Sequence, residues 1–195
     1  QAKSNIMSLL FTIESKIVKP YTETLLISPF REIWERDTNA GKFTAIDEFT
    51  YIEFMTSVKK SNPYRGYTPE ERAKRLAVDV MKHELYEPDE LVKRGMEVLV
   101  EFQQTASPTY NYYMSAKRAI YKIQTFFDTF DLSEKNEKTG MPLYKPKDVT
   151  TTVNDTEKVL QNLSALQEKV DNELFETTKT KGQKIVSPFA NPDSL

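Results

Sequence analysis

The chain lacks the residues on which several kinds of chemistry depend. It contains no cysteine and a single histidine, His83. Disulfide scaffolds, thiolate metal sites and thiol nucleophiles are therefore excluded, and no histidine pair exists to hold a metal ion. Its 5 glycines are too scattered for a phosphate-binding loop of the GxxxxGK or GxGxxG type. The sequence thus predicts a protein that is not an enzyme and that has no cofactor and no metal site.

Long hydrophobic runs and a strong charge of either sign are also missing. The longest apolar stretches, such as residues 6–13, are far shorter than the roughly 20 residues of a membrane helix. The N-terminus shows neither the basic start nor the cleavage site of a signal peptide. A net charge of -2 gives no overall attraction to nucleic acid or anionic lipid. We expect a soluble, intracellular protein without a small-molecule substrate or membrane contact, and nucleic-acid contact is not favoured.

Aromatic residues and proline positions indicate a folded, helical chain. The 10 tyrosines and 11 phenylalanines argue against general disorder. Proline suits the first position of a helix, so four pairs predict helix starts: Ser28-Pro29, Thr68-Pro69, Glu87-Pro88 and Ser107-Pro108. In the second pair, Glu71 completes a capping box with Thr68. We predict a mainly α fold, an irregular helical bundle of about five to six helices with extended N- and C-terminal arms.

Apolar residues three and four positions apart support these helices. They recur from 73 to 85, from 91 to 102 and, most strongly, from 112 to 130. A narrower stripe near the C-terminus resembles a coiled-coil seam and packs either on its own domain or on a neighbouring chain. It consists of Val159, Leu163, Leu166, Val170 and Leu174.

Irregular segments divide the chain into five parts. Residues 1–27 form an N-terminal arm, either extended or with a short strand pair around Pro20, and residues 28–131 form a helical core domain. Residues 132–150 are a loop, residues 151–177 an amphipathic helix and residues 178–195 an extended C-terminal tail. The tail either frays or docks on another subunit. Its apolar residues are Ile185, Val186, Phe189 and Leu195.

The remaining candidate sites have simple explanations. His83 lacks the nucleophile and orienting partner of a general base, so we interpret it as a surface or boundary residue of the helix that covers 73–85. Asp89 and Glu90 are expected to be first-turn charges of a helix. The basic cluster at 72–75 is interpreted as a solvated helix face, with contact to a nucleic-acid backbone as the alternative.

The block from Ile27 to Tyr67 is the most distinctive part of the chain. It contains the single tryptophan, in REIWERD, where opposite charges stand four residues apart and can pair along a helix. The segment FTYIEFMTSV at 49–58 fits a strand or a helix by composition. We interpret it as a buried helix because AIDEF leads into it without a break, and we expect Glu53 to pair with Arg31 or Arg36.

REIWERD, AIDEFTYIEFM and KSNPYRGY together resemble a small structural protein of tailed bacteriophages, most similar to those of the crAss-like group that infect gut bacteria. The resemblance covers residues 28–80. It implies a virion component, assembled in the host bacterial cytoplasm: a ring subunit of the neck or tail that forms a homo-oligomer and contacts the portal or an adjacent ring. The alternative is a packaged virion protein, or a regulatory protein or DNA-binding module. The candidate partner-contact residues are Trp34, Arg36, Tyr64, Tyr67, Leu163, Leu166, Val170, Ile185, Val186, Phe189 and Leu195.

Overall fold

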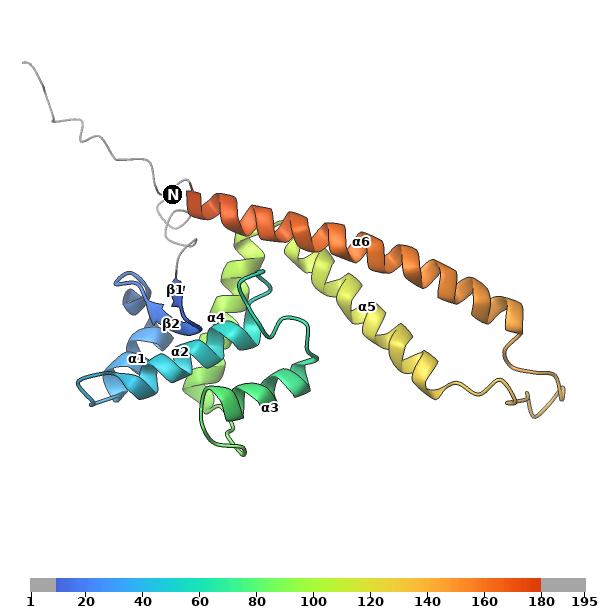
Figure 1. Ribbon diagram of the computed structural model, residues 1–195, viewed down its shortest axis with the longest axis horizontal. Helices are drawn as coiled ribbons and strands as arrows, with labels where there is room; N and C mark the ends of the chain where they lie inside the picture. Colours follow the sequence, from blue (N-terminus) through green and yellow to red (C-terminus); the bar gives the residue numbers. More distant parts are fainter. Residues whose placement is uncertain (1–9, 180–195) are drawn as a thin grey trace, which may run out of the picture. The chain divides into compact units, whose positions relative to one another are not determined.

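The computed structural model describes residues 10–179, with side chains up to residue 174, and it is mainly helical (Figure 1). Six helices follow a small two-stranded sheet, so the predicted fold class is confirmed. The elements are β1 (Phe11–Glu14), β2 (Ile17–Pro20), the 3-10 helix η2 (Thr24–Leu26), α1 (Ser28–Arg36), α2 (Phe43–Thr56), α3 (Pro69–Asp79), α4 (Glu90–Ala106), α5 (Tyr110–Thr129) and α6 (Pro146–Lys179).

The chain divides into two compact units, residues 1–107 with 171–195 and residues 108–170. Of the described elements, the first unit holds β1 to α4 and the end of α6, and the second holds α5 and the rest of α6. This division differs from the predicted core domain at 28–131. Helix α5 belongs to the second unit, and residues 10–27 contribute to the core of the first.

Helix α2 is the centre of the first unit. It packs against β2, α3 and α4, and both Phe49 and Ile52 are fully buried. The Phe30 ring of α1 meets Phe49 edge-on with centroids 6.2 Å apart. A helix with apolar residues on nearly all sides is stable only when other elements enclose it. Residues 49–58, whose composition fits a strand or a helix, therefore form a buried helix up to Thr56.

Helix α4 crosses α2 closely at Gly95. A Cβ atom at this position would lie 2.8 Å from Cδ1 of Ile52 and 3.4 Å from the Phe30 ring. Glycine in a helix interior costs up to about 1 kcal/mol relative to alanine, but here it permits a close approach of two helices.

Residues 11–20 form an antiparallel hairpin and not an extended arm. The alternative of a strand pair was right in kind, but the chain turns at Ser15 and Lys16, whereas Pro20 ends β2. Both turn residues have positive φ, 51° and 67°, as a two-residue type I′ turn requires. Phe11 and Val18 are buried, so the hairpin is part of the core.

Two helix starts are confirmed and two are shifted. Helix α1 begins at Ser28 with proline in its first turn, and Thr68 forms the full capping box with Glu71 at the start of α3. Helix α4 instead begins at Glu90, with Asp89 as its cap. Helix α5 begins at residue 110, after Thr109.

The apolar spacing from 73 to 85 does not give one continuous helix. Helix α3 ends at Asp79, and Lys82 adopts a positive φ of 55°. His83 therefore lies in the turn that follows, where its N–H donates to the carbonyl of Ala77. The prediction of a helical His83 was wrong, because the left-handed residue reverses the chain.

The C-terminal part differs from expectation in its boundaries. The connection between α5 and α6 runs from residue 130 to residue 145. Within it, an isolated antiparallel β-bridge pairs the backbones of Lys135 and Pro142. Helix α6 starts at Pro146, ahead of the predicted 151. The predicted tail overlaps α6 at residues 178 and 179 and otherwise lies outside the described residues, as do Ile185, Val186, Phe189 and Leu195.

Candidate interaction surfaces

Arg36, at the end of α1, links three helices. Its guanidinium donates to Glu48 of α2 at 2.6 Å and to Asp89, the cap of α4, at 2.5 Å. Burial raises the pKa of Glu48 above its ordinary value, although Arg36 acts in the opposite direction. Desolvation acts on Asp89 too, but the N–H of Val92 and Arg36 together hold the pKa of Asp89 below its ordinary value. Arg36 thus makes its ion pairs within its own chain.

These ion pairs replace the ones expected from helical spacing. Arg36 pairs with Glu48 and Asp89. Among the described residues no ion pair joins the buried Glu53 to Arg31 or Arg36, so that expected pair was wrong. Glu32 approaches Arg94 of α4 at 3.6 Å. The charges of REIWERD therefore fasten α1 to other helices, in addition to lying along its own surface.

Trp34 is partly buried on the corner between α1 and α2. Its indole stacks nearly parallel to the Phe49 ring at a centroid distance of 6.3 Å. Nζ of Lys42 lies 5.5 Å from the indole and donates to the carbonyls of Trp34 at 3.0 Å and Asp37 at 2.5 Å. A cation at the C-terminal end of a helix is favourable, because the last carbonyls carry partial negative charge. Lys42 thus holds the indole in place and satisfies carbonyl groups at the C-terminal end of α1.

Asp37 fixes the other side of this corner. Its carboxylate accepts from the N–H of Ala45 in the first turn of α2 at 3.0 Å and from the N–H of Asn39 at 2.9 Å. These hydrogen bonds stabilise the charged form and lower the pKa of Asp37 below its ordinary value. The stretch DTNAG at 37–41 is therefore an ordered link between two helices.

The loop between α2 and α3 is held by two buried polar side chains. The amide of Asn62 donates to the carbonyl of Phe54 at 2.9 Å and to that of Ser57 at 2.6 Å. Arg72 donates to the carbonyls of Met55 and Arg65, each at 2.9 Å. Since Arg72 is 8% exposed, the basic cluster at 72–75 is not wholly a solvated face.

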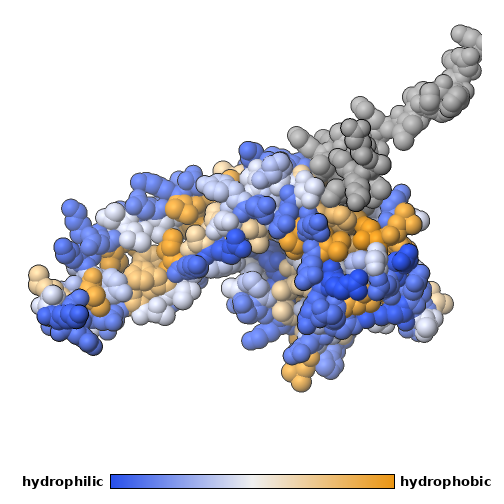
Figure 2. Space-filling view, turned by 180° about the vertical axis from the view of Figure 1, so that it is seen from behind, coloured by the Kyte–Doolittle hydropathy of each residue, from blue (hydrophilic) through white to orange (hydrophobic). Residues whose placement is uncertain are grey.

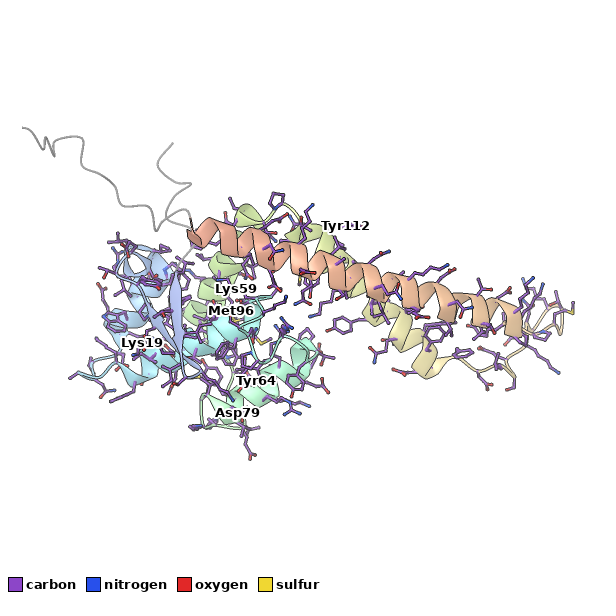
Figure 3. All side chains as sticks on the ribbon, turned by 45° about the horizontal axis from the view of Figure 1, so that its top comes forward. Lys19, Lys59, Tyr64, Asp79, Met96 and Tyr112 are labelled. Atoms are coloured by element: carbon purple, nitrogen blue, oxygen red, sulfur yellow. The ribbon has the colours of Figure 1, made fainter. Side chains whose placement is uncertain are left out.

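The rings of Tyr64 and Tyr67 lie together, with centroids 6.4 Å apart (Figure 3 labels Tyr64 and Asp79). Tyr64 donates from its hydroxyl to Asp79 at 2.9 Å, and the guanidinium of Arg75 lies 4.2 Å from the Tyr67 ring. Burial, followed by the bond to Asp79, raises the pKa of Tyr64 to about 12. This small polar and aromatic surface at α3 can contact a partner through stacking and hydrogen bonds.

The unit at 108–170 buries very few of its side chains. Its residues are all described, and its buried ones are Thr109, Tyr110, Tyr113 and Val170. Tyr113 donates from its hydroxyl to Gln167 of α6 at 3.1 Å. The predicted seam residues Leu163 and Leu166 remain partly exposed.

Aromatic rings gather at the far end of α5. Phe126 stacks on Phe130 at 5.3 Å, and Tyr144 from the connection meets both rings edge-on, at 5.5 and 5.9 Å. These rings are only partly buried. Figure 2 shows orange, apolar surface between hydrophilic residues along this helical pair.

Two exposed apolar residues of α6 were not among the predicted contacts. Val153 is 51% exposed and Leu160 is 48% exposed. They stand seven residues apart, next to the seam that begins at Val159, so they share one face of the helix. The sequence contains this spacing, but it lies outside the heptad stripe from Val159 to Leu174.

Within residues 10–179 no group of histidine or acidic side chains is arranged to hold a metal ion, and no described helix is long and apolar enough to span a membrane. Comparisons with protein-family models, curated proteins and solved structures give no match to this chain.

Proposed function

We propose that this protein is a non-enzymatic structural protein of a tailed bacteriophage virion. In this proposal it is a ring subunit of the neck or tail that connects to the portal. The observation that carries the proposal is the poorly buried unit at 108–170, in which aromatic and aliphatic side chains remain on the surface along two helices. The second support is the resemblance of residues 28–80 to small virion proteins.

Exposed apolar surface of this extent has a physical meaning. A helix pair has an apolar face that two helices alone cannot enclose, and contiguous exposed apolar surface in soluble proteins usually marks a contact with another molecule. The exposed apolar side chains of this unit come from both α5 and α6 and from the connection between them. A partner surface that covers them would complete the core of this unit.

The first experiment compares two variants of α6 that add the same charge. Val153→Glu with Leu160→Glu places carboxylates on the apolar face, whereas Asn154→Glu with Gln161→Glu places them on neighbouring exposed positions. Burying an unpaired carboxylate in a contact costs several kcal/mol, so we expect association to weaken by more than about 100-fold in the first variant only. Size-exclusion chromatography with light scattering, alone and with the virion's portal, gives the masses.

The proposal requires three results together. The protein must be found in purified virions by mass spectrometry, the wild type must form an oligomer or a portal complex, and the apolar-face variant must lose it while circular dichroism shows unchanged helicity. A stable monomer that ignores the portal and adjacent ring proteins, and that is missing from virions, would refute a structural role.

The runner-up, a regulatory protein that binds DNA through residues 72–75, has less support. Arg72 is buried and bonded to backbone carbonyls, and Arg75 lies over the Tyr67 ring. Lys74 remains exposed. DNA binding through phosphates would weaken steeply between low and moderate salt. Filter binding without salt-sensitive DNA retention would remove this alternative.

A further inference from the structure

The outer edge of β1 is an open strand edge. In a two-residue hairpin the residues next to the turn, Glu14 and Ile17, form a hydrogen-bonded pair, so Ile13 opposite Val18 is a non-hydrogen-bonded pair. The N–H of Val18 accordingly points away from β1 and donates to Oγ1 of Thr50 at 3.0 Å. By the same alternation, the backbone groups of Phe11 and Ile13 point away from β2.

The two edges of this sheet differ in how well they are protected against pairing with another strand. Helix α2 packs against β2, and β2 also carries Lys19 and Pro20, which discourage pairing at an edge. The sequence of β1, FTIE, has neither lysine nor proline. Among the described residues, none supplies a hydrogen bond to the outward backbone groups of Phe11 and Ile13. An edge of this kind is a template for one further extended segment.

We infer that the β1 edge of one subunit accepts residues 184–187, Lys-Ile-Val-Ser, from the C-terminal segment of a neighbouring copy. The chain continues for 16 residues past Lys179, the end of the described part. Residue 184 lies five residues past Lys179, a stretch that spans at most about 18 Å when extended. Residues 184–187 equal β1 in length and contain two adjacent β-branched residues. Pro188 follows directly and cannot donate to a strand ladder, which limits the added strand to this segment.

An added strand would also extend the apolar side of the hairpin. The side chains of Phe11 and Ile13 face the core, whereas Thr12 and Glu14 lie on the outer face. Because side chains alternate, either Ile185 or Val186 would lie beside Phe11 and Ile13. The other would lie on the outer face, beside Thr12 and Glu14.

A neighbouring copy is the occupant that suits a ring, and in this respect the inference rests on the proposed function. A tail that docks on the next subunit is a head-to-tail contact, which closes into a ring when the rotation per subunit allows it. A symmetric contact between two identical surfaces would stop at a dimer.

Disulfide trapping tests the contact directly, because the natural chain has no cysteine. A Thr12→Cys chain is mixed under assembly conditions with chains that carry one cysteine each at positions 184, 185, 186 or 187, and is then oxidised mildly. Thr12 is a non-hydrogen-bonded position on the outer edge, where facing Cβ atoms come close enough for a disulfide. We expect covalent dimers at alternate tail positions, roughly tenfold above the intervening ones. A Met7→Cys chain in place of the tail variants is the matched control for the other terminal segment.

The outcomes separate this inference from the proposed function. Dimers at alternate tail positions support the inference. Cross-linking of Thr12→Cys to Met7→Cys and not to the tail cysteines overturns the inference. It is also overturned if the disulfide forms only within a single chain that carries both Thr12→Cys and a tail cysteine, while mixed chains do not cross-link. Intact oligomers and virion incorporation without any tail cross-link also overturn it but leave the ring role standing. Absence of both assembly and virion incorporation defeats the proposed function itself.

Discussion

At the scale of single residues, Arg36 compensates a buried charge. We expect Arg36→Leu to lower the free energy of unfolding by about 2 kcal/mol at pH 7, because it leaves the Glu48 carboxylate buried without its cation. The side chain of Arg36 is 35% exposed, so the cost is below that of a fully buried pair. Urea denaturation followed by circular dichroism measures it.

The pH dependence of the free energy of unfolding of Arg36→Leu tests whether Glu48 causes the loss of stability. Burial raises the folded pKa of Glu48 above its unfolded value of roughly 4.3. The folded state then binds the proton more readily, so the variant should regain stability as the pH falls from 7 through the folded pKa of Glu48. Asp37 has a lowered pKa and acts in the opposite sense below its unfolded pKa of about 3.9. Asp89 loses one of the groups that lower its pKa when Arg36 is removed. The double variant Arg36→Leu with Glu48→Leu should not regain stability as the pH falls. If it does, the recovery of stability belongs to a group other than Glu48.

Asn62 is buried and holds the loop between α2 and α3 through its hydrogen bonds. Asn62→Ala would leave the carbonyls of Phe54 and Ser57 and the N–H of Tyr64 without this partner. We expect a loss of about 3 kcal/mol in the free energy of unfolding. The exposed Asn154→Ala is the control and should change stability by less than about 0.5 kcal/mol. Equal denaturation midpoints for both variants would contradict the assigned role.

At the scale of elements, the crossing of α4 over α2 depends on Gly95. Gly95→Leu should destabilise the fold by about 2 kcal/mol, because even a Cβ atom would meet Ile52 at 2.8 Å. Gly66→Leu is the matched control, since nothing lies within 4 Å of a Cβ atom there. Thermal unfolding of both variants checks the difference. A normal melting temperature for Gly95→Leu would mean that the two helices separate at little cost.

Local signals predicted some elements well and others poorly. The start of α3 was predictable because Thr68 and Glu71 act within one turn. The position of the hairpin turn was not, because Ser15-Lys16 is not a pair that favours a type I′ turn. For the candidate surfaces, Tyr64 and Tyr67 are neighbours in sequence and could be grouped. The partners of Arg36 lie 12 and 53 residues away, where helical spacing carries no information.

At the scale of the whole molecule, the C-terminal segment is predicted to serve assembly and not folding of the subunit. Deletion of residues 179–195 should leave the helicity of the isolated protein nearly unchanged while it impairs oligomer formation. Circular dichroism and light scattering on the same sample measure the two effects. A shorter deletion of residues 192–195, which keeps Ile185, Val186 and Phe189, is the control. An equal loss of helicity and assembly would show that the segment belongs to the subunit's own fold.

The turn at Ser15 and Lys16 makes the hairpin dependent on the rest of the fold. Left-handed residues other than glycine cost roughly 1–2 kcal/mol each, and an isolated two-stranded hairpin is marginal in water. The hairpin therefore depends on Phe11 and Val18 reaching a core that α1, α2 and α4 have already built. Unfinished chains then present no preformed strand to one another. The open edge of β1 therefore exists only in a chain whose core has formed, and an unfolded chain offers no such edge for pairing.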